Sequence, residues 1–293
     1  MNRYIEIIKN AYSGYWNYLK NSVLFEVQLE NYFYGLIIIS LFIWLLELRF
    51  PWRKNQPVFR KDFWLDTFYM FFNFFLLNLI VLTALSNVTE QLLNDTLGIV
   101  NLSVASFQLF DVNSFPYILK LLVFFISLDF IQWFTHILLH RYEFLWNFHK
   151  VHHSVKQMGF AAHLRYHWME PVLYNSFKYI VLAIMGGFTI QDVAIVHFFN
   201  ISMGHLNHAN INIDYGFLKY IFNNPKMHIW HHVKELPSGR KNGVNYGITL
   251  SIWDYIFKTN YIPHDGRDIE IGFKEDEKFP KDFIVQELYP FRK

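Results

Sequence analysis

The stretch from His136 to Ser154, HILLHRYEFLWNFHKVHHS, carries five histidines at helical spacings. His136 and His140 are four residues apart, and an HxxHH pattern follows at 149–153. Side chains three and four positions apart lie on one face of a helix, so each cluster directs its imidazoles to one side. A second HxxHH at 228–232 repeats the pattern. This repetition favours metal binding over a solvated helix face, which is the common meaning of an isolated histidine pair.

The composition indicates a membrane protein. Hydrophobic residues make up 53% of the 293 residues and aromatic residues 20%, which is high for a soluble domain. The absence of cysteine excludes disulfides, thiolate zinc sites and any cysteine-ligated iron–sulfur cluster carried by this chain. The net charge of +2 gives no support to nucleic-acid binding.

Three apolar runs, at 31–46, 63–85 and 117–140, approach the roughly 20 helical residues that cross a bilayer once their flanks are counted. The connection 49–62 carries five lysines and arginines, whereas the connection 86–119 carries none. By the positive-inside rule, the first connection is cytoplasmic and the second, predicted to be a loop, lies on the opposite side. The third run then ends on the cytoplasmic side at the first histidine cluster.

Two shorter apolar segments, 172–187 and 193–203, are separated by the turn signal GGFTIQD. They predict a helical hairpin that enters the membrane and returns His205 and His208 to the cytoplasmic side. We therefore expect an all-α integral membrane protein with about four transmembrane or hairpin helices. A cytosolic helical cap would carry the last part of a histidine-rich dinuclear metal site, with short helices at 226–233 and 250–258.

The expected organisation is a single membrane-embedded domain over residues 1–293. It would comprise an N-terminal interfacial segment (1–30), membrane helices with the first histidine clusters (31–208) and the cytosolic cap with the last cluster (209–293). All histidine clusters would then meet on one face of the membrane, as shared metal ligands must.

Ten of the 14 histidines are candidate ligands. One metal ion accepts four to six ligands, so ten imidazoles on one side predict two ions. Imidazole suits iron, zinc, copper and nickel alike. Neither the HExxH of zinc proteases nor the Glu-x-x-His of soluble di-iron bundles is present. The predicted ligands are His136, His140, His149, His152, His153, His205, His208, His228, His231 and His232.

The clusters HILLH, HKVHH, HLNH and HIWHH, followed by NYG at 245–247 and SIWDYIFKT at 251–259, resemble a known superfamily. It is the fatty acid hydroxylase and sterol desaturase superfamily of membrane di-iron enzymes, with particular similarity to the sterol desaturase and alkylglycerol monooxygenase branches. The matching motifs span roughly residues 129–260. Two departures stand out: HLNH is an HxxH where some relatives have HxxxH, and Trp168 stands where proline usually follows the histidine.

The resemblance implies an oxidoreductase that uses two iron ions, replaceable by zinc in a purified protein, and dioxygen as co-substrate. It would hydroxylate an unactivated C–H bond of a membrane lipid, or desaturate the lipid at the same site, on the cytoplasmic side of the membrane. Electrons would come from a separate electron-transfer protein. A non-enzymatic metal-binding or transport protein is the alternative, although transport favours ionisable residues deep in several spans and only Asp66 and Asp129 are found there.

Six further residues are candidates for supporting the metal site from outside it. Asp129 lies seven residues before His136, on the same predicted helix face, and ligating histidines usually donate their second ring nitrogen to such a group. The segment HLRYHWME contributes three candidates, and the last motifs contribute two that would brace the final helix. The set is Asp129, His163, His167, Glu170, Asn245 and Asp254. The two histidines at 197 and 264 are predicted to be ordinary hydrogen-bonded or solvated side chains.

Overall fold

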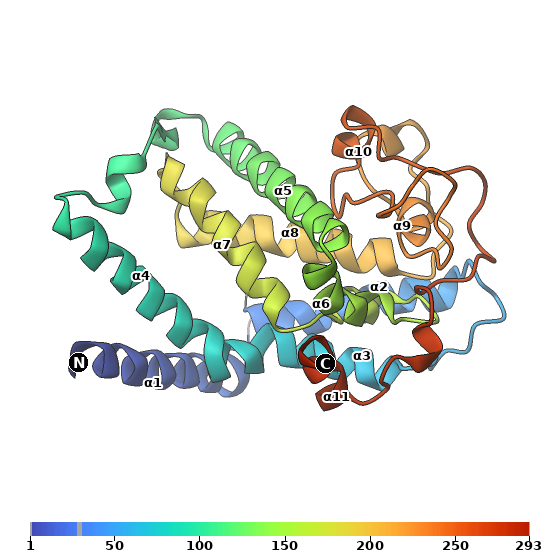
Figure 1. The fold of residues 1–293 in the computed structure, drawn as a ribbon, viewed down its shortest axis with the longest axis horizontal. Coiled ribbons are helices and arrows are strands. Elements are labelled where there is room, and N and C mark those ends of the chain that lie inside the picture. Colours follow the sequence, from blue (N-terminus) through green and yellow to red (C-terminus); the bar gives the residue numbers. More distant parts are fainter. Residues whose placement is uncertain (1, 28–30, 293) are drawn as a thin grey trace.

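The computed structural model describes residues 2–27 and 31–292, which form a helical molecule with one pair of two-residue strands (Figure 1). This confirms the predicted all-α membrane fold; the number of spans and the cytosolic position of the cap stay predictions. The helices are α1 (Asn2–Leu24), α2 (Tyr32–Arg49), α3 (Phe63–Phe71), α4 (Thr83–Ile99), α5 (Tyr117–Arg141), α6 (Glu143–His153), α7 (Met169–Ile184), α8 (Ile190–His208), α9 (Pro225–His231), α10 (Ile252–Ile256) and α11 (Phe283–Leu288). The strands are β1 (Phe110–Asp111) and β2 (Met185–Gly186).

Three helical stretches are long and apolar enough to cross a membrane: Tyr32–Arg49, Phe63–Ile99 and Tyr117–Arg141. The second joins α3 to α4 through two π-helical turns, Phe72–Leu76 and Asn78–Leu82. Single π-helical turns within α-helices are often found at functional sites. Residues of both turns line the cavity described below.

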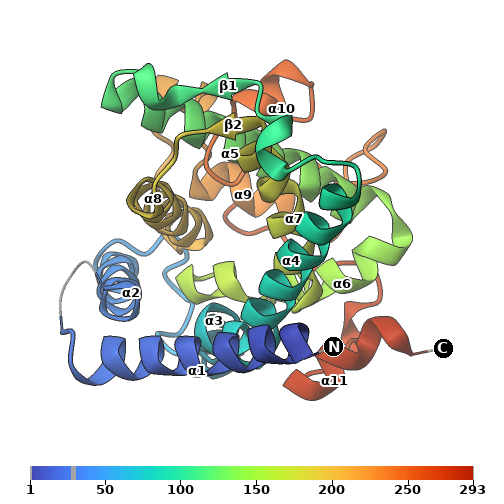
Figure 2. The ribbon, with the colours of Figure 1, turned by 90° about the vertical axis from the view of Figure 1, so that its left-hand side faces the viewer.

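The predicted loop 86–119 is wrong in its first part, because α4 continues as helix to Ile99. Residues 86–97 contain neither proline nor glycine, and Asp95 ties them to α1. Asp95 accepts hydrogen bonds from Arg3 at 3.1 Å and from Tyr4 at 2.7 Å. The predicted interfacial segment 1–30 thus includes a helix that packs along α4 (Figure 2).

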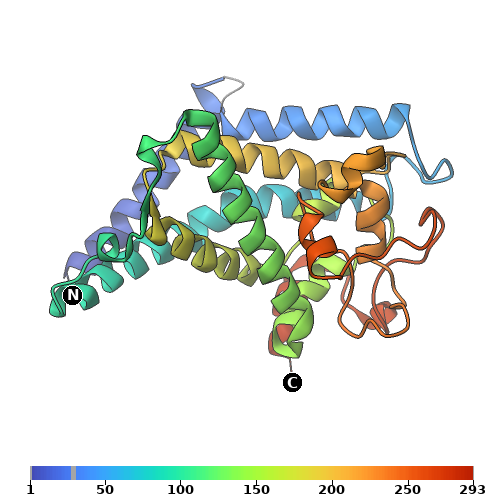
Figure 3. The same ribbon diagram turned by 90° about the horizontal axis from the view of Figure 1, so that it is seen from above.

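The α7–α8 hairpin extends along most of the length of α5. Its turn is tied to the residues just before α5 by the parallel pairing of Phe110 with Met185 and of Asp111 with Gly186. Lys120, near the start of α5, forms a 2.7 Å ion pair with Asp192, near the start of α8. The hairpin therefore turns at the end of α5 that is farthest from the histidines. Seen from above, α8 also runs beside α2 (Figure 3).

Residues 209–292 close the opposite end of the bundle. They contain α9 and α10, near the helices predicted at 226–233 and 250–258, and the chain then returns to place α11 against the C-terminal end of α3. There Tyr69 donates a 2.9 Å hydrogen bond to Gln286. The histidine clusters come from the C-terminal ends of α5, α6 and α8 and from α9, and Figure 1 shows how these helices are arranged.

Candidate metal centre

Nine buried or nearly buried histidines from α5, α6, α8 and α9 converge into two groups. Within each group, the ligating atoms lie within 4.8 Å of one another. In the part of the chain that the structure describes, neither group contains a carboxylate or a cysteine. Group A is His136, His140, His149, His153 and His231, and group B is His152, His208, His228 and His232.

Helical spacing explains how two short segments serve both groups. On α6, His149 and His153 are four residues apart and face group A, while His152 faces group B. The second HxxHH, at the end of α9, has the reverse arrangement: His228 and His232 belong to group B and His231 to group A. Positions three and four apart are neighbours on a helix, and in the structure each motif is divided between two adjacent groups.

The hydrogen bonds of the outer ring nitrogens leave lone pairs facing inward. In group B, His152 donates from Nδ1 to the carbonyl of Arg165 at 3.1 Å and His208 to that of Gly204 at 2.8 Å. A neutral imidazole carries one proton, so both Nε2 atoms are bare acceptors, yet they lie only 3.3 Å apart. Two acceptors cannot bond each other. Two nitrogens that ligate one ion at about 2.1 Å lie about 3.0–3.4 Å apart, so this pair fits a shared cation.

Group A has the same arrangement. His136 donates from Nδ1 to the carbonyl of Tyr246 at 2.7 Å, and His231 donates to that of Val244 at 2.8 Å. Within residues 2–27 and 31–292, the buried Nε2 of His140 has no hydrogen-bond partner. An unpaired polar atom at a buried position is costly, and a metal ion in group A would satisfy this one.

The histidines on and beside α6 and α9 are held neutral, which is the protonation state that ligates metal. Burial lowers the pKa of His152 to about 4. For the others, burial and the neighbouring imidazoles keep the pKa well below its ordinary value; these are His149, His153, His228, His231 and His232.

Asn245 and Asp254 hold the loop whose carbonyls orient group A. Asp254 accepts hydrogen bonds from the backbone N–H groups of Tyr246 at 2.9 Å and Gly247 at 2.8 Å, and from Trp133 at 3.1 Å. Asn245, in the left-handed region with φ of 52°, donates to the carbonyl of Met227 at the start of α9. Both side chains therefore act on the histidines through backbone that they fix in place.

Glu170 and Asp129, the two acidic candidates nearest the first cluster in sequence, have different partners. Glu170 Oε2 lies 2.9 Å from Nδ1 of His149, so it contacts group A directly. Asp129 instead accepts from the indole of Trp253 at 2.8 Å and from the backbone N–H of Leu250. Its carboxylate fastens α5 to the segment leading into α10.

His205 does not join the nine converging histidines, although it was predicted as a ligand. Its Nε2 lies 3.2 Å from the hydroxyl of Ser40 on α2, and its Nδ1 lies 2.9 Å from Nδ1 of His163. His205 lies three positions before His208 on α8. The ring of His205 is directed toward α2 and away from group B. His163 lies beside the His208 ring, whereas Nε2 of His167 donates to the carbonyl of Glu287 at 2.7 Å. The ring of His167 is thus hydrogen-bonded to the C-terminal region.

A buried ion network missed at the sequence level positions one of these carbonyls. Arg165 is 1% exposed and lies 2.9 Å from Asp66 of α3, which also pairs with Arg60. The carbonyl of Arg165 is the acceptor for His152. Asp66, a lone charge in an apolar run, was the sequence signal for this network.

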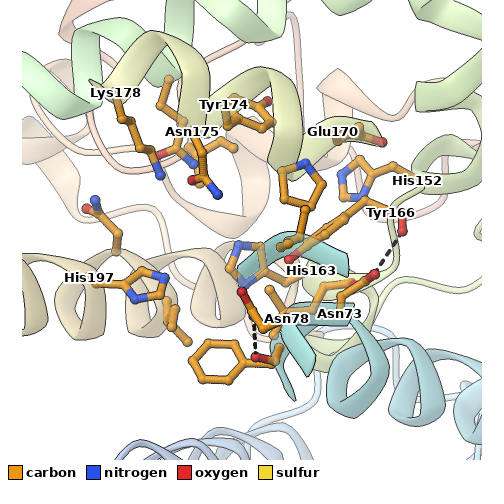
Figure 4. Close-up of a pocket in the computed structure, with 18 of the residues that line it drawn as sticks. Asn73, Asn78, His152, His163, Tyr166, Glu170, Tyr174, Asn175, Lys178 and His197 are labelled. Atoms are coloured by element: carbon orange, nitrogen blue, oxygen red, sulfur yellow. Dashed lines mark hydrogen bonds between the residues drawn. The ribbon is translucent and has the colours of Figure 1, made fainter. Parts of the chain in front are cut away.

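Both groups open onto one cavity of about 340 Å³ between the membrane helices (Figure 4). His136 and His149 of group A and His152 and His208 of group B line it. Its walls come from α5, α7, α8 and the π-helical turns after α3, and Figure 4 shows side chains of α7, α8 and the π-helical turns directed into it. Buried nitrogen ligands at one end of a cavity among membrane helices suit chemistry on a lipid.

Comparison with known proteins agrees with this geometry. Residues 121–259, which contain all nine converging histidines, match the family model described as fatty acid hydroxylase. Residues 121–259 are thus similar to the fatty acid hydroxylase family. An ornithine lipid hydroxylase of Rhizobium tropici, a member of the superfamily, is 31% identical over 163 residues, which are 56% of this chain and 47% of the relative.

An alkylglycerol monooxygenase of Homo sapiens is 29% identical over 136 residues, or 46% of this chain and 29% of its own length. The enzyme of the same name from Xenopus tropicalis is 28% identical over 143 residues, which are 47% of this chain and 30% of the relative. The matches thus cover less than half of the length of each of these relatives. No solved structure matches the chain. The three membrane-length helices and the match to this family together indicate an integral membrane protein.

Proposed function

We propose that this chain is an O2-dependent di-iron hydroxylase that acts on an unactivated C–H bond of a membrane lipid. The observation that carries the proposal is the opening of two buried histidine groups onto a single cavity between membrane helices. The names of the relatives, lipid hydroxylase and alkylglycerol monooxygenase, support the reaction class. One membrane-embedded domain, residues 1–293, would provide the site.

In this proposal group A holds one iron ion and group B the other. When bound, the two ions supply the redox chemistry that activates dioxygen for attack on a C–H bond. The chain's own residues orient and protect the site: backbone carbonyls fix the ring tautomers, and Glu170 orients His149. The cavity excludes bulk water and holds the reacting carbon close to both groups.

Two further parts of the proposal concern the surroundings of the site. The histidine groups lie at the end of α5 that the positive-inside rule places in the cytoplasm. This chain contains no cysteine that could hold an iron–sulfur cluster, so a separate electron-transfer protein supplies the electrons. A desaturase would use the same site, and the relatives' names favour hydroxylation.

Metal analysis after anaerobic purification tests the centre. We expect two iron ions per chain in the wild type, about one in His152→Ala, and two in the matched control His264→Ala, whose side chain is exposed in the cap. An unchanged metal content in His152→Ala would contradict the assignment of group B.

Lipid profiling of cells with and without the chain tests the reaction. Gain of one oxygen atom in a lipid class is the expected result, and it must vanish in His152→Ala. Loss of two hydrogens would assign the desaturase instead, and no change with oxygen and reductant supplied would refute both. Two bound ions without any lipid change would favour the metal-binding alternative.

A further inference from the structure

The cavity has a second, polar end that the metal chemistry does not use. On α7, Glu170, Tyr174 and Lys178 follow at four-residue intervals and line the cavity together with Asn175. Residues at this spacing share one helix face. Figure 4 shows Lys178 and Asn175 directed from α7 into the space opposite His197 of α8. We call Asn175, Lys178 and His197 the polar end.

The polar end lies well away from the histidine groups. Eight positions separate Lys178 from Glu170, the contact of His149, which is about 12 Å along a helix at ~1.5 Å per residue. On α8, eleven positions separate His197 from His208 of group B. One cavity therefore joins the metal centre to a distant set of polar side chains.

Lys178 carries an unmatched charge among the described residues. Its Nζ has neither a hydrogen bond nor an ion pair there, and Glu170 is the only acidic side chain among the residues lining the cavity. Lys120, the other lysine close to this hairpin, is paired with Asp192. An ionisable side chain within a membrane bundle is costly unless it is paired or serves a function. A ligand with a negative group would supply the missing partner.

The neighbours of Lys178 suit an oxyanion. Asn175 offers amide hydrogens, and it makes no hydrogen bond within the described chain. His197 is stacked on Phe74 with ring centroids 5.7 Å apart, and it also lies beside Tyr32, so its ring is held in the cavity wall. It was predicted to be an ordinary hydrogen-bonded or solvated histidine, and it lies in the wall of the cavity. An ammonium headgroup would instead meet the positive charge of Lys178.

We propose that the cavity binds its lipid by an anionic group, a carboxylate or a phosphate, held by Lys178 and Asn175. The hydrocarbon chain then runs toward the histidine groups, and oxidation falls on a carbon distant from the anion, since the rise of α7 from Lys178 to Glu170 is about 12 Å. The position of oxidation rests on the proposed function. Anion binding does not, because it needs neither dioxygen nor turnover.

The test compares four single-chain probes that differ only in headgroup: hexadecanoate, hexadecyl phosphate, hexadecanol and hexadecylammonium. Binding to the purified metal-loaded chain is measured in a neutral detergent without oxygen or reductant. We expect one or both anions to bind about tenfold or more tightly than the alcohol, since hydrogen bonds to charged groups are the strong ones. The ammonium should bind most weakly. The preferred anion identifies the carboxylate or phosphate source.

Three variants complete the test. Lys178→Met should lose the preference for anions while binding hexadecanol as before, which shows that the cavity is intact. Lys178→Arg should keep the preference, and so should Lys9→Met, a matched loss of an exposed lysine on α1. Equal binding of alcohol and anions by the wild type, or an anion preference that persists in Lys178→Met, would overturn the proposal. A failure to oxidise any probe would count against the hydroxylase function and leave the binding result standing.

Discussion

Replacing Glu170 by glutamine should weaken metal binding in group A selectively. Oε2 of Glu170 lies 2.9 Å from Nδ1 of His149, and both side chains are 3% exposed. Glutamine keeps an acceptor oxygen but removes the negative charge that makes His149 a stronger ligand and offsets the charge of an ion. Outer partners of this kind contribute about 10- to 100-fold in metal affinity. This corresponds to about 1.4–2.7 kcal/mol.

Competition with a chelator measures this effect, using zinc as an ion that dioxygen does not oxidise. Wild type and Glu170→Gln are compared with Glu143→Gln, an exposed acid on α6. The first variant should lose affinity for one of two ions and keep the other, while the control keeps both. Unchanged affinity for both ions in Glu170→Gln would refute the reasoning, because the contact with His149 would then have no influence on the ion.

Three other predictions follow from the site and its supports. His208→Ala should lose one of the two metal ions, whereas His205→Ala, three positions away, should keep both. Metal analysis of the two variants tests this. Loss of an ion in His205→Ala would show that His205 is a ligand. Asp254→Asn should lower the free energy of unfolding by about 3 kcal/mol, because the amide cannot accept from both backbone N–H groups; a melting temperature equal to that of the wild type would contradict this. Burial raises the pKa of Glu287 to about 7 from 4.5, so the folded state keeps a proton that the unfolded state releases. Stability should therefore fall as pH rises from about 4.5 to 7, and Glu287→Gln should flatten that part of the profile of melting temperature against pH.

Local patterns were sufficient for the main features of the fold and of the metal centre. Apolar runs located the three membrane-length helices, since bilayer thickness sets their length. The two HxxHH motifs predicted convergence, because a helix places such side chains at fixed angles. The division of each motif between two groups is seen only in the structure.

Features that depend on tertiary neighbours were not predictable. Residues 86–99 have no apolar run, and their helix depends on packing with α1. His205 has the spacing of a ligand, yet Ser40 and His163 hold its ring elsewhere. Lys178 is a single cation in an apolar segment, and only the arrangement of α7 against α8 shows that it faces a cavity.

The sharing of α6 and of the α9 motif between groups A and B also bears on how the site moves. Because each segment carries ligands for both groups on adjacent faces, neither can rotate to loosen one group without displacing the other. The two groups therefore share the segments that hold them. Loading of the first ion would order both segments and so prepare the second position.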